Sequence, residues 1–240
     1  MANIIPAQAE RINTAAAGLV KTAAESFPPL RGISTDGQAG VTGTNDTTGY
    51  GVLGSGKGEA GVAGLHTAGG NGVYGKSTGN AGCFDGNVQV NGNITVTGDL
   101  YLPGADCAEQ FQVGGDSLIE PGTVVVFDGD GALRESGEAY DRKVAGVIAG
   151  AGEYRPGIVL DKHAVETRNR AAISLIGKAY CKVDAGYAPI EVGDMLTSSP
   201  TQGHAMKVVD RERAFGSVVG KALRPLADGR GLIPILITLQ

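Results

Sequence analysis

The chain has 240 residues, of which 40 are glycine and 10 are proline, and its formal net charge at pH 7 is −5. Glycine is far more frequent than in an average protein, but it does not recur at every third position, so the composition excludes collagen. The 20 basic and 25 acidic residues form no long runs of one sign, which excludes the basic patch typical of nucleic-acid or anionic-membrane binding. We expect no nucleic-acid partner.

The cysteines and the apolar segments exclude further classes. Cys83, Cys107 and Cys181 are odd in number and widely separated, which fits neither a disulfide framework nor a zinc site. No stretch approaches the ~20 apolar residues of a membrane span, and the N-terminus lacks the charged start and apolar run of a secretory signal. We therefore expect a protein made in the cytoplasm without a signal peptide, with no membrane span, no metal and no cofactor.

Residues 1–30 are predicted to form an attachment segment. Residues 7–25 are rich in alanine and free of proline, which favours a helix. Its apolar residues recur at three- and four-residue steps and include Ile12, Leu19 and Val20. A single helix of this length is marginal in water, so its apolar face needs a partner. Two sister helices, a particle baseplate or other structural protein, and the chain's own domain are the alternatives.

Residues 31–104 contain a glycine-led repeat with a spacing of about ten residues. The lead glycines are Gly32, Gly40, Gly51, Gly61, Gly72 and Gly82, followed by Ile33, Val41, Val52, Val62, Val73 and Cys83. In phrases such as Gly61-Val62-Ala63-Gly64, glycine stands at both ends of a two-residue apolar unit. Because glycine alone reaches positive φ without steric cost, each phrase predicts a short strand flanked by tight turns.

The last part of this region changes its period. Gly86, Gly92, Gly98 and Gly104 are evenly spaced, and the pairs Val88 and Val90, Ile94 and Val96, and Leu100 and Leu102 lie between them. Alternation with period two predicts strands with one buried face. The dipeptides Asn91-Gly92, Thr97-Gly98 and Pro103-Gly104 predict the turns. This hexapeptide pattern also occurs in single-chain β-helices, but three hexads make only about one coil.

The repeat is too poor in apolar residues to form an ordinary core within one chain. A solenoid of ~20 or more residues per coil would have only about two or three coils here, which is marginal for a repeat array. Three chains wrapped about a common axis would bring each valine against two others. We therefore predict a homotrimeric β-helical or β-spiral shaft over residues 31–104. The predicted trimer core is Val41, Val52, Val62, Val73, Val88, Val90, Ile94, Val96, Leu100 and Leu102.

Residues 105–240 have the composition of a globular β domain, with short apolar runs separated by glycine and proline. This pattern favours a barrel or a sandwich. The domain also contains a duplication: 119–124 matches 190–195, 131–133 matches 203–206, and 145–148 matches 217–220. The sequence thus predicts a mainly β protein with an N-terminal helix, a glycine-rich shaft and a duplicated C-terminal β domain.

No catalytic, cofactor or metal site is predicted. The histidines His66, His163 and His204 lack a second ligand at metal spacing, and a Cys107/His163 pair is the weak nucleophilic candidate. The run from Asp128 to Gly131 lacks the glutamate of a calcium loop and predicts a hairpin turn. We expect a protein that is not an enzyme.

The repeat phrases, leading into Val88-Gln89-Val90-Asn91-Gly92-Asn93-Ile94 and then a compact β domain, resemble trimeric fibres or spikes of tailed phages and phage-derived contractile particles. The resemblance implies a virion or phage-like particle, attachment through the N-terminus, and a C-terminal domain that meets the host. A cell-surface glycan is a candidate partner. The available stacking groups are Tyr140, Tyr154, Tyr180 and Tyr187.

The segments Ala105-Asp106-Cys107-Ala108-Glu109-Gln110-Phe111 and Asp141-Arg142-Lys143-Val144-Ala145-Gly146-Val147 are similar to autoproteolytic chaperone domains of phage appendages. A self-cleaving intramolecular chaperone is therefore one alternative function. A polysaccharide-degrading spike is another, although such enzymes use paired carboxylates and the shaft has only scattered acids. A bacterial surface or assembly-scaffold protein is the third.

Overall fold

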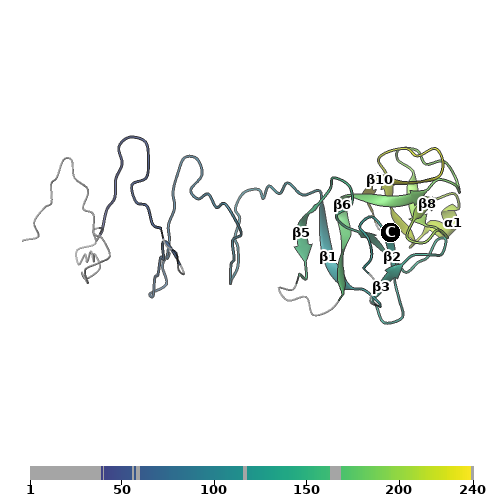
Figure 1. The fold of residues 1–240 in the computed structure, drawn as a ribbon, viewed down its shortest axis with the longest axis horizontal. Coiled ribbons are helices and arrows are strands. Elements are labelled where there is room, and N and C mark those ends of the chain that lie inside the picture. The colour runs from purple at the N-terminus through teal and green to yellow at the C-terminus, as the bar shows by residue number, and fades with distance from the viewer. Residues whose placement is uncertain are drawn as a thin grey trace, which may run out of the picture. The chain divides into compact units, whose positions relative to one another are not determined.

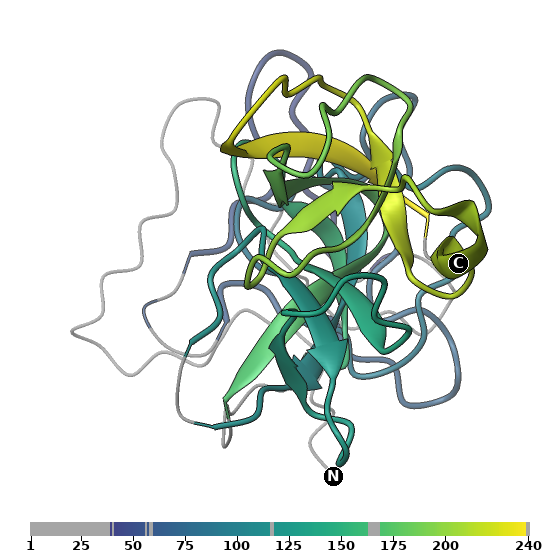
Figure 2. The ribbon, with the colours of Figure 1, turned by 90° about the vertical axis from the view of Figure 1, so that its right-hand side faces the viewer.

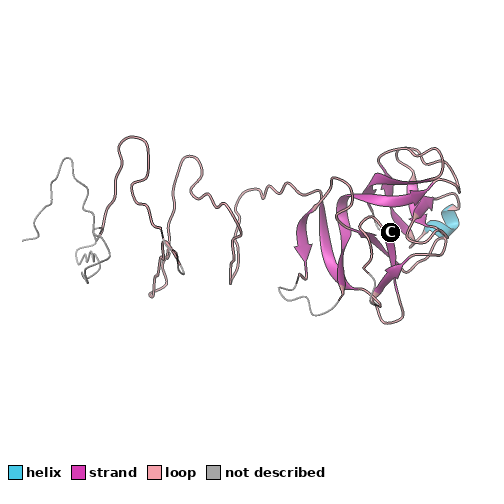
Figure 3. Ribbon diagram, viewed as in Figure 1, coloured by secondary structure: helices cyan, strands magenta, loops and turns pink. Residues whose placement is uncertain are grey.

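The computed structural model describes residues 39, 41–55, 57, 60–115, 118–162 and 169–238. The chain divides into two units, Met1–Gln89 and Val90–Gln240. The described residues are mainly β, and α1 (Arg211–Ala214) is their one helix (Figure 3). The predicted helix with Ile12, Leu19 and Val20 lies outside the described residues. The predicted division into 1–30, 31–104 and 105–240 stays a prediction.

The described part of the first unit consists of successive loops without a strand or a helix (Figure 1). The short strands predicted for the glycine phrases do not form within the described part of the single chain, and their formation between three chains stays a prediction. A strand requires a ladder of backbone hydrogen bonds to a neighbour, and the phrases make no such ladder within the described part of this unit.

The second unit contains ten strands in one sheet. They are β1 (Asp106–Gln112), β2 (Val124–Phe127), β3 (Leu133–Glu135), β4 (Val144–Ile148), β5 (Pro156–Leu160), β6 (Arg170–Asp184), β7 (Met195–Ser198), β8 (Ala205–Lys207), β9 (Val218–Ala222) and β10 (Arg230–Ile237).

The long strand β6 joins two closed rings of strands (Figures 1 and 2). Its second half pairs with β8 and β10, and the order β6-β8-β7-β9-β10 returns to β6. Its first half pairs with β1 and β4. That side continues through β2 to β3, and an isolated parallel bridge between Val113 and Leu133 connects β3 back to the end of β1. The sheet is therefore barrel-like in both halves.

The two rings repeat the same register. The parallel bridge between Val113 and Leu133 has its counterpart in the bridge between Val183 and Ala205. The β2–β4 and β7–β9 pairs each contain one register shift at the same place. The duplication seen in the sequence is thus present in the hydrogen-bond pattern of the sheet.

The register corrects one detail of the sequence match. Gly146 lies opposite Val125, and Gly220 lies opposite Leu196, so these two glycines are equivalent. The sequence match had instead placed Gly146 against Val218. A Cβ on Gly146 would come within 2.6 Å of Ile173 Cγ2, and one on Gly220 would meet the carbonyl oxygen of Leu236. The close approach of the neighbouring strand therefore requires glycine at both positions.

Each ring has its own apolar interior. The first ring is filled around Leu133 and Ile173, and the second around Leu196, Val219 and Ile235. All five side chains are fully buried. This unit therefore gains its hydrophobic stabilisation from contacts within one chain.

Candidate assembly surface

Glycines at the ends of successive phrases pack against each other through their backbones. A Cβ on Gly51 would lie 2.7 Å from the carbonyl oxygen of Gly43, and one on Gly61 would lie 2.9 Å from that of Gly54. These glycines do not have positive φ; Gly49 and Gly69, which do, belong to the loops between phrases. The expected reason for the paired glycines is therefore wrong, because close backbone contact and not positive φ requires them.

Val52, Val62 and Val73 each touch the phrase before them with one methyl group. A Cβ on Gly43 would clash with Cγ2 of Val52. Cγ2 of Val62 and Cγ2 of Val73 would clash in the same way with a Cβ on Gly54 and on Gly64. The rest of each side chain faces outward. The exposed fractions are 63% for Val41, 71% for Val52, 71% for Val62 and 76% for Val73.

The six apolar side chains of the hexad segment are exposed as well. The values are 61% for Val88, 47% for Val90, 73% for Ile94, 49% for Val96, 65% for Leu100 and 41% for Leu102. The chain bends at 91–92 and 97–98, where turns were predicted, but forms no strand there. The predicted turn at Pro103-Gly104 is wrong, because Gly104 packs its backbone against Gly157.

All ten residues predicted for the trimer core are therefore exposed in the single chain. Burying one such side chain contributes about 1.5–3 kcal/mol, so the repeat presents a series of apolar groups that the chain itself does not cover. We call this set of ten residues the assembly surface. Its burial between three chains stays a prediction.

The start of the barrel continues this apolar character. Leu102, Ile158 and Ile176 line a hollow of about 210 Å³, and each is at least 41% exposed. Among the described residues, β5 pairs with β1 alone, so its second edge has no strand partner there. Edges of this kind commonly receive a strand from another chain.

His66 and His204 make hydrogen bonds within their own turns. Nδ1 of His66 accepts hydrogen bonds from the backbone N–H groups of Ala68 and Gly70, and His204 hydrogen-bonds the carbonyl of Gln202 in its own turn. Complete burial raises the pKa of Cys181 to about 12, so this thiol is unreactive near neutral pH. His163 lies outside the described residues, and the Cys107/His163 pair with it.

The acidic hairpin closes as predicted. Oδ1 of Asp128 accepts hydrogen bonds from the backbone N–H groups of Asp130 and Ala132, and Gly131 adopts φ +78°. The carboxylate thus holds the β2–β3 turn. Within the described ranges, no group of three or more His, Cys, Asp or Glu side chains is arranged to hold a metal ion.

All four candidate stacking tyrosines make contacts within the barrel unit. Tyr140 is buried, its hydroxyl accepts hydrogen bonds from two backbone N–H groups, and Arg213 covers its ring. The rings of Tyr154 and Tyr180 pack on each other at 5.1 Å, and Lys178 lies over Tyr154. The Tyr187 hydroxyl hydrogen-bonds Thr201 Oγ1 at 3.0 Å, and the side chain is 49% exposed.

No family model matches the chain, and no curated protein matches it either. Among solved structures, it is similar to pre-mature gene product 12 of bacteriophage phi29, with 17% identity and a TM-score of 0.45. This match covers 62% of the chain and 24% of gene product 12, so the chain spans about a quarter of that protein.

A C-terminal fragment of the same phi29 protein matches with 18% identity and a TM-score of 0.37, over 55% of the chain and 100% of the fragment. The N base of the phi29 head fiber gp8.5 matches with 20% identity and a TM-score of 0.24, over 56% of the chain and 90% of that protein. Likenesses at this level establish neither a shared fold nor a shared function. In the parts of the chain that the structure describes, no helix has the length and hydropathy to cross a membrane.

Proposed function

We propose that the chain is a structural, non-enzymatic component of a phage or phage-like particle, in which three copies form a fibre or spike. The assembly surface is buried between the copies, and the N-terminal segment attaches the fibre to the particle. The duplicated barrel is carried at the other end, where it meets a host surface or another part of the particle.

The observation that carries this proposal is the exposure of every residue of the assembly surface in the single chain. The phrases are held in register by glycine backbone contacts, so one valine is presented at each step. Three chains related by an axis can bury the valine of every phrase, because each layer then contains the same side chain from each of the three chains. The particle context rests on the resemblance of the repeat phrases to phage fibres.

Native mass spectrometry tests the assembly. We expect a mass near three times the 24.3 kDa of one chain. A protein that stays a single chain at micromolar concentration contradicts the proposal. Labelling of the protein within purified particles by immuno-electron microscopy then tests its place in a virion.

Self-cleavage is the second candidate, and one contact favours it. The Ser174 hydroxyl donates a hydrogen bond to the Asp106 carboxylate, and both side chains are buried. Burial raises the pKa of Asp106, which the bond from Ser174 partly offsets. A carboxylate next to a hydroxyl can act as the general base for a nucleophilic serine. Incubation of the purified chain and of Asp106→Asn tests this function: a shorter fragment only in the former supports it, and no fragment excludes it.

A further inference from the structure

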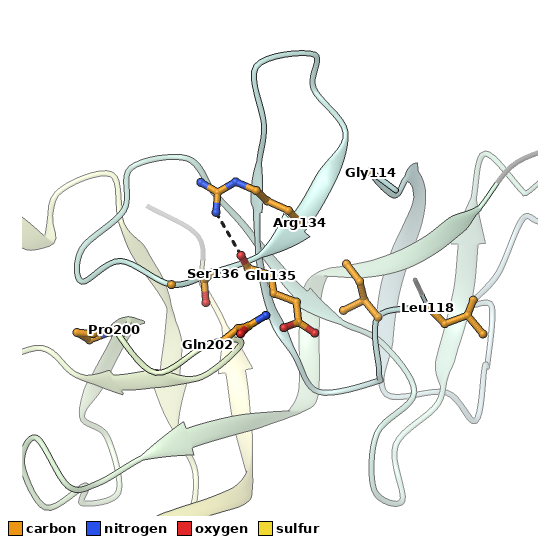
Figure 4. Close-up of a pocket in the computed structure, with 9 residues that line it drawn as sticks. Gly114, Leu118, Arg134, Glu135, Ser136, Pro200 and Gln202 are labelled. Carbon is orange, nitrogen blue, oxygen red and sulfur yellow. Dashed lines mark hydrogen bonds between the residues drawn. The ribbon is translucent and has the colours of Figure 1, made fainter. Parts of the chain in front are cut away.

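A cleft lies where the two rings of the barrel unit meet. It has a volume of about 720 Å³, which is within the range of small-molecule sites. Figure 4 shows that Glu135 and Ser136, at the end of β3, approach Gln202 of the loop between β7 and β8. The apolar residues of its lining are Leu118, Ile119 and Pro200, and Figure 4 shows Leu118 and Pro200 at opposite ends of it.

Main-chain hydrogen bonds hold the floor of the cleft in place. The N–H of Gly203 donates to the carbonyl of Ser136 at 2.8 Å, and the N–H of Ser136 donates to the carbonyl of Val124 at 2.9 Å. The N–H of Val124 in turn donates to the carbonyl of Gly203 at 2.9 Å. The backbone beneath Glu135, Ser136 and Gln202 is thus set before any ligand arrives.

A comparison of equivalent positions in the two rings separates the side chains that the fold requires from those that it does not. Glu135 lies opposite Val125 in the β2–β3 pair, and Lys207 lies opposite Leu196 in the β7–β8 pair, so Lys207 is the counterpart of Glu135. Asp194 is in the same way the counterpart of Thr123, because each directly precedes the first residue of its strand. In the second ring, Lys207 Nζ and Asp194 Oδ2 form an ion pair at 2.8 Å. In the first ring, Glu135 makes no side-chain hydrogen bond or ion pair with the described residues, and Thr123 Oγ1 has no partner among them.

Ser136 shows the same contrast. Its counterpart in the second ring is Val208. The Ser136 N–H donates to the carbonyl of Val124, the first residue of β2, and the Val208 N–H donates to that of Met195, the first residue of β7. Val208 packs against an apolar cluster. The Ser136 side chain is fully buried, yet Oγ has no hydrogen-bond partner among the described residues. A valine satisfies the fold at this position, so the hydroxyl is not required for folding, although leaving it unpaired is costly.

The chemistry of these groups identifies the ligand class. A carboxylate, an amide and a hydroxyl hydrogen-bond to adjacent sugar hydroxyls, which both donate and accept. The apolar residues of the lining suit the C–H face of a sugar ring. Glu135 is the one acid of the lining, and the Arg134 guanidinium is turned to the backbone carbonyl of Glu135. This favours a neutral ligand over an anionic one and does not provide the ligand set of a metal ion.

We propose that this cleft binds a neutral glycan through Glu135 and Gln202. The Gln202 side chain is exposed at the cleft, and the buried Ser136 belongs to its lining. The inference rests on the proposed function in one respect: the glycan is the surface partner that the fibre carries its barrel to meet.

Saturation-transfer NMR on the full chain tests the site with glucose, galactose, mannose, N-acetylglucosamine and their neutral disaccharides as probes. We expect saturable binding of at least one probe. We also expect that Glu135→Ala and Gln202→Ala each weaken it by about tenfold or more, which is the loss of one charged or strong hydrogen bond. The matched control is Glu153→Ala, because Glu153 is exposed and lies outside the cleft. Ser136→Val, which copies Val208, is expected to keep the melting temperature and to weaken binding.

Two results overturn the inference: no probe binds, or Glu153→Ala weakens binding as much as Glu135→Ala. Native mass measured on the same sample separates the two proposals. A trimer that binds no probe contradicts the cleft and leaves the fibre. A single chain that binds a probe contradicts the fibre and leaves the cleft.

Discussion

The repeat region and the barrel place their apolar side chains in opposite environments. Leu133 and Ile235 of the barrel are fully buried, whereas Val62 of the repeat is 71% exposed. In the barrel, strands far apart in sequence surround each apolar residue. In the repeat, each phrase contacts its neighbour through glycines that have no side chain to bury. The difference shows that the barrel buries its apolar side chains within one chain and that the repeat does not.

The largest effect is expected from charges on the assembly surface. Val62→Asp combined with Val73→Asp would place carboxylates in the proposed core of all three chains. Unpaired buried charges are very costly, so we expect loss of the trimer by native mass spectrometry and unchanged unfolding of the barrel by circular dichroism. Thr67→Asp, in an exposed loop, is the control. A trimer that tolerates the double substitution would rule out these valines as its core.

A cavity in the barrel should act differently. Leu133→Ala removes a fully buried side chain and is expected to lower the free energy of unfolding by about 2–5 kcal/mol. This loss should not depend on protein concentration, because the contacts lie within one chain. Val62→Ala should change the barrel little and should weaken assembly in a concentration-dependent way. Urea unfolding at two protein concentrations distinguishes the two variants. The same dependence on protein concentration in both variants would contradict the difference between barrel and repeat.

The glycine contacts predict a smaller cost. Gly61→Ala places a methyl group 2.9 Å from the carbonyl oxygen of Gly54, whereas a methyl group on Gly79 meets only Ser77 Oγ at 3.9 Å. Neither glycine has positive φ. We expect Gly61→Ala to destabilise the assembled repeat by about 1–3 kcal/mol and Gly79→Ala to be tolerated. Thermal dissociation of the trimer measures both, and a similar midpoint for the two would show that the phrases do not pack in this way.

The smallest effect concerns pH. A hydrogen bond from Thr201, aided by Arg230 and the Gly186 N–H, lowers the pKa of Asp184 below its ordinary 3.8, against the opposing effect of burial. A depressed pKa contributes stability that is present above pH 3.8 and is lost as pH falls through the folded-state value.

Thr201→Val removes the largest of these interactions, so the variant should lose less stability than the wild type between about pH 7 and about pH 3. Urea midpoints at the two pH values measure this. An equal loss in both proteins would show that Thr201 does not depress the pKa.

The sequence predicted the mainly β class because period-two runs and turn residues are local signals. It also predicted the duplication from 119–124 and 190–195, but it misplaced Gly146, because register depends on a bulge that local similarity does not reveal. The cleft escaped prediction altogether. Glu135 and Gln202 are far apart in the chain and meet only through the packing of the two rings. The contrast of Ser136 with Val208 becomes visible only when the registers are known.

Cys83 provides the most direct test, because it follows Gly82 at the position that valine occupies in other phrases and is exposed in the single chain. Iodoacetamide labelling of the native protein, followed by mass spectrometry of the Cys83 peptide, reports its accessibility. We expect Cys83 to react about tenfold or more slowly than in the variant with Asp at positions 62 and 73. Equal, rapid labelling of Cys83 in both proteins would contradict the claim that the glycine repeat is buried between chains.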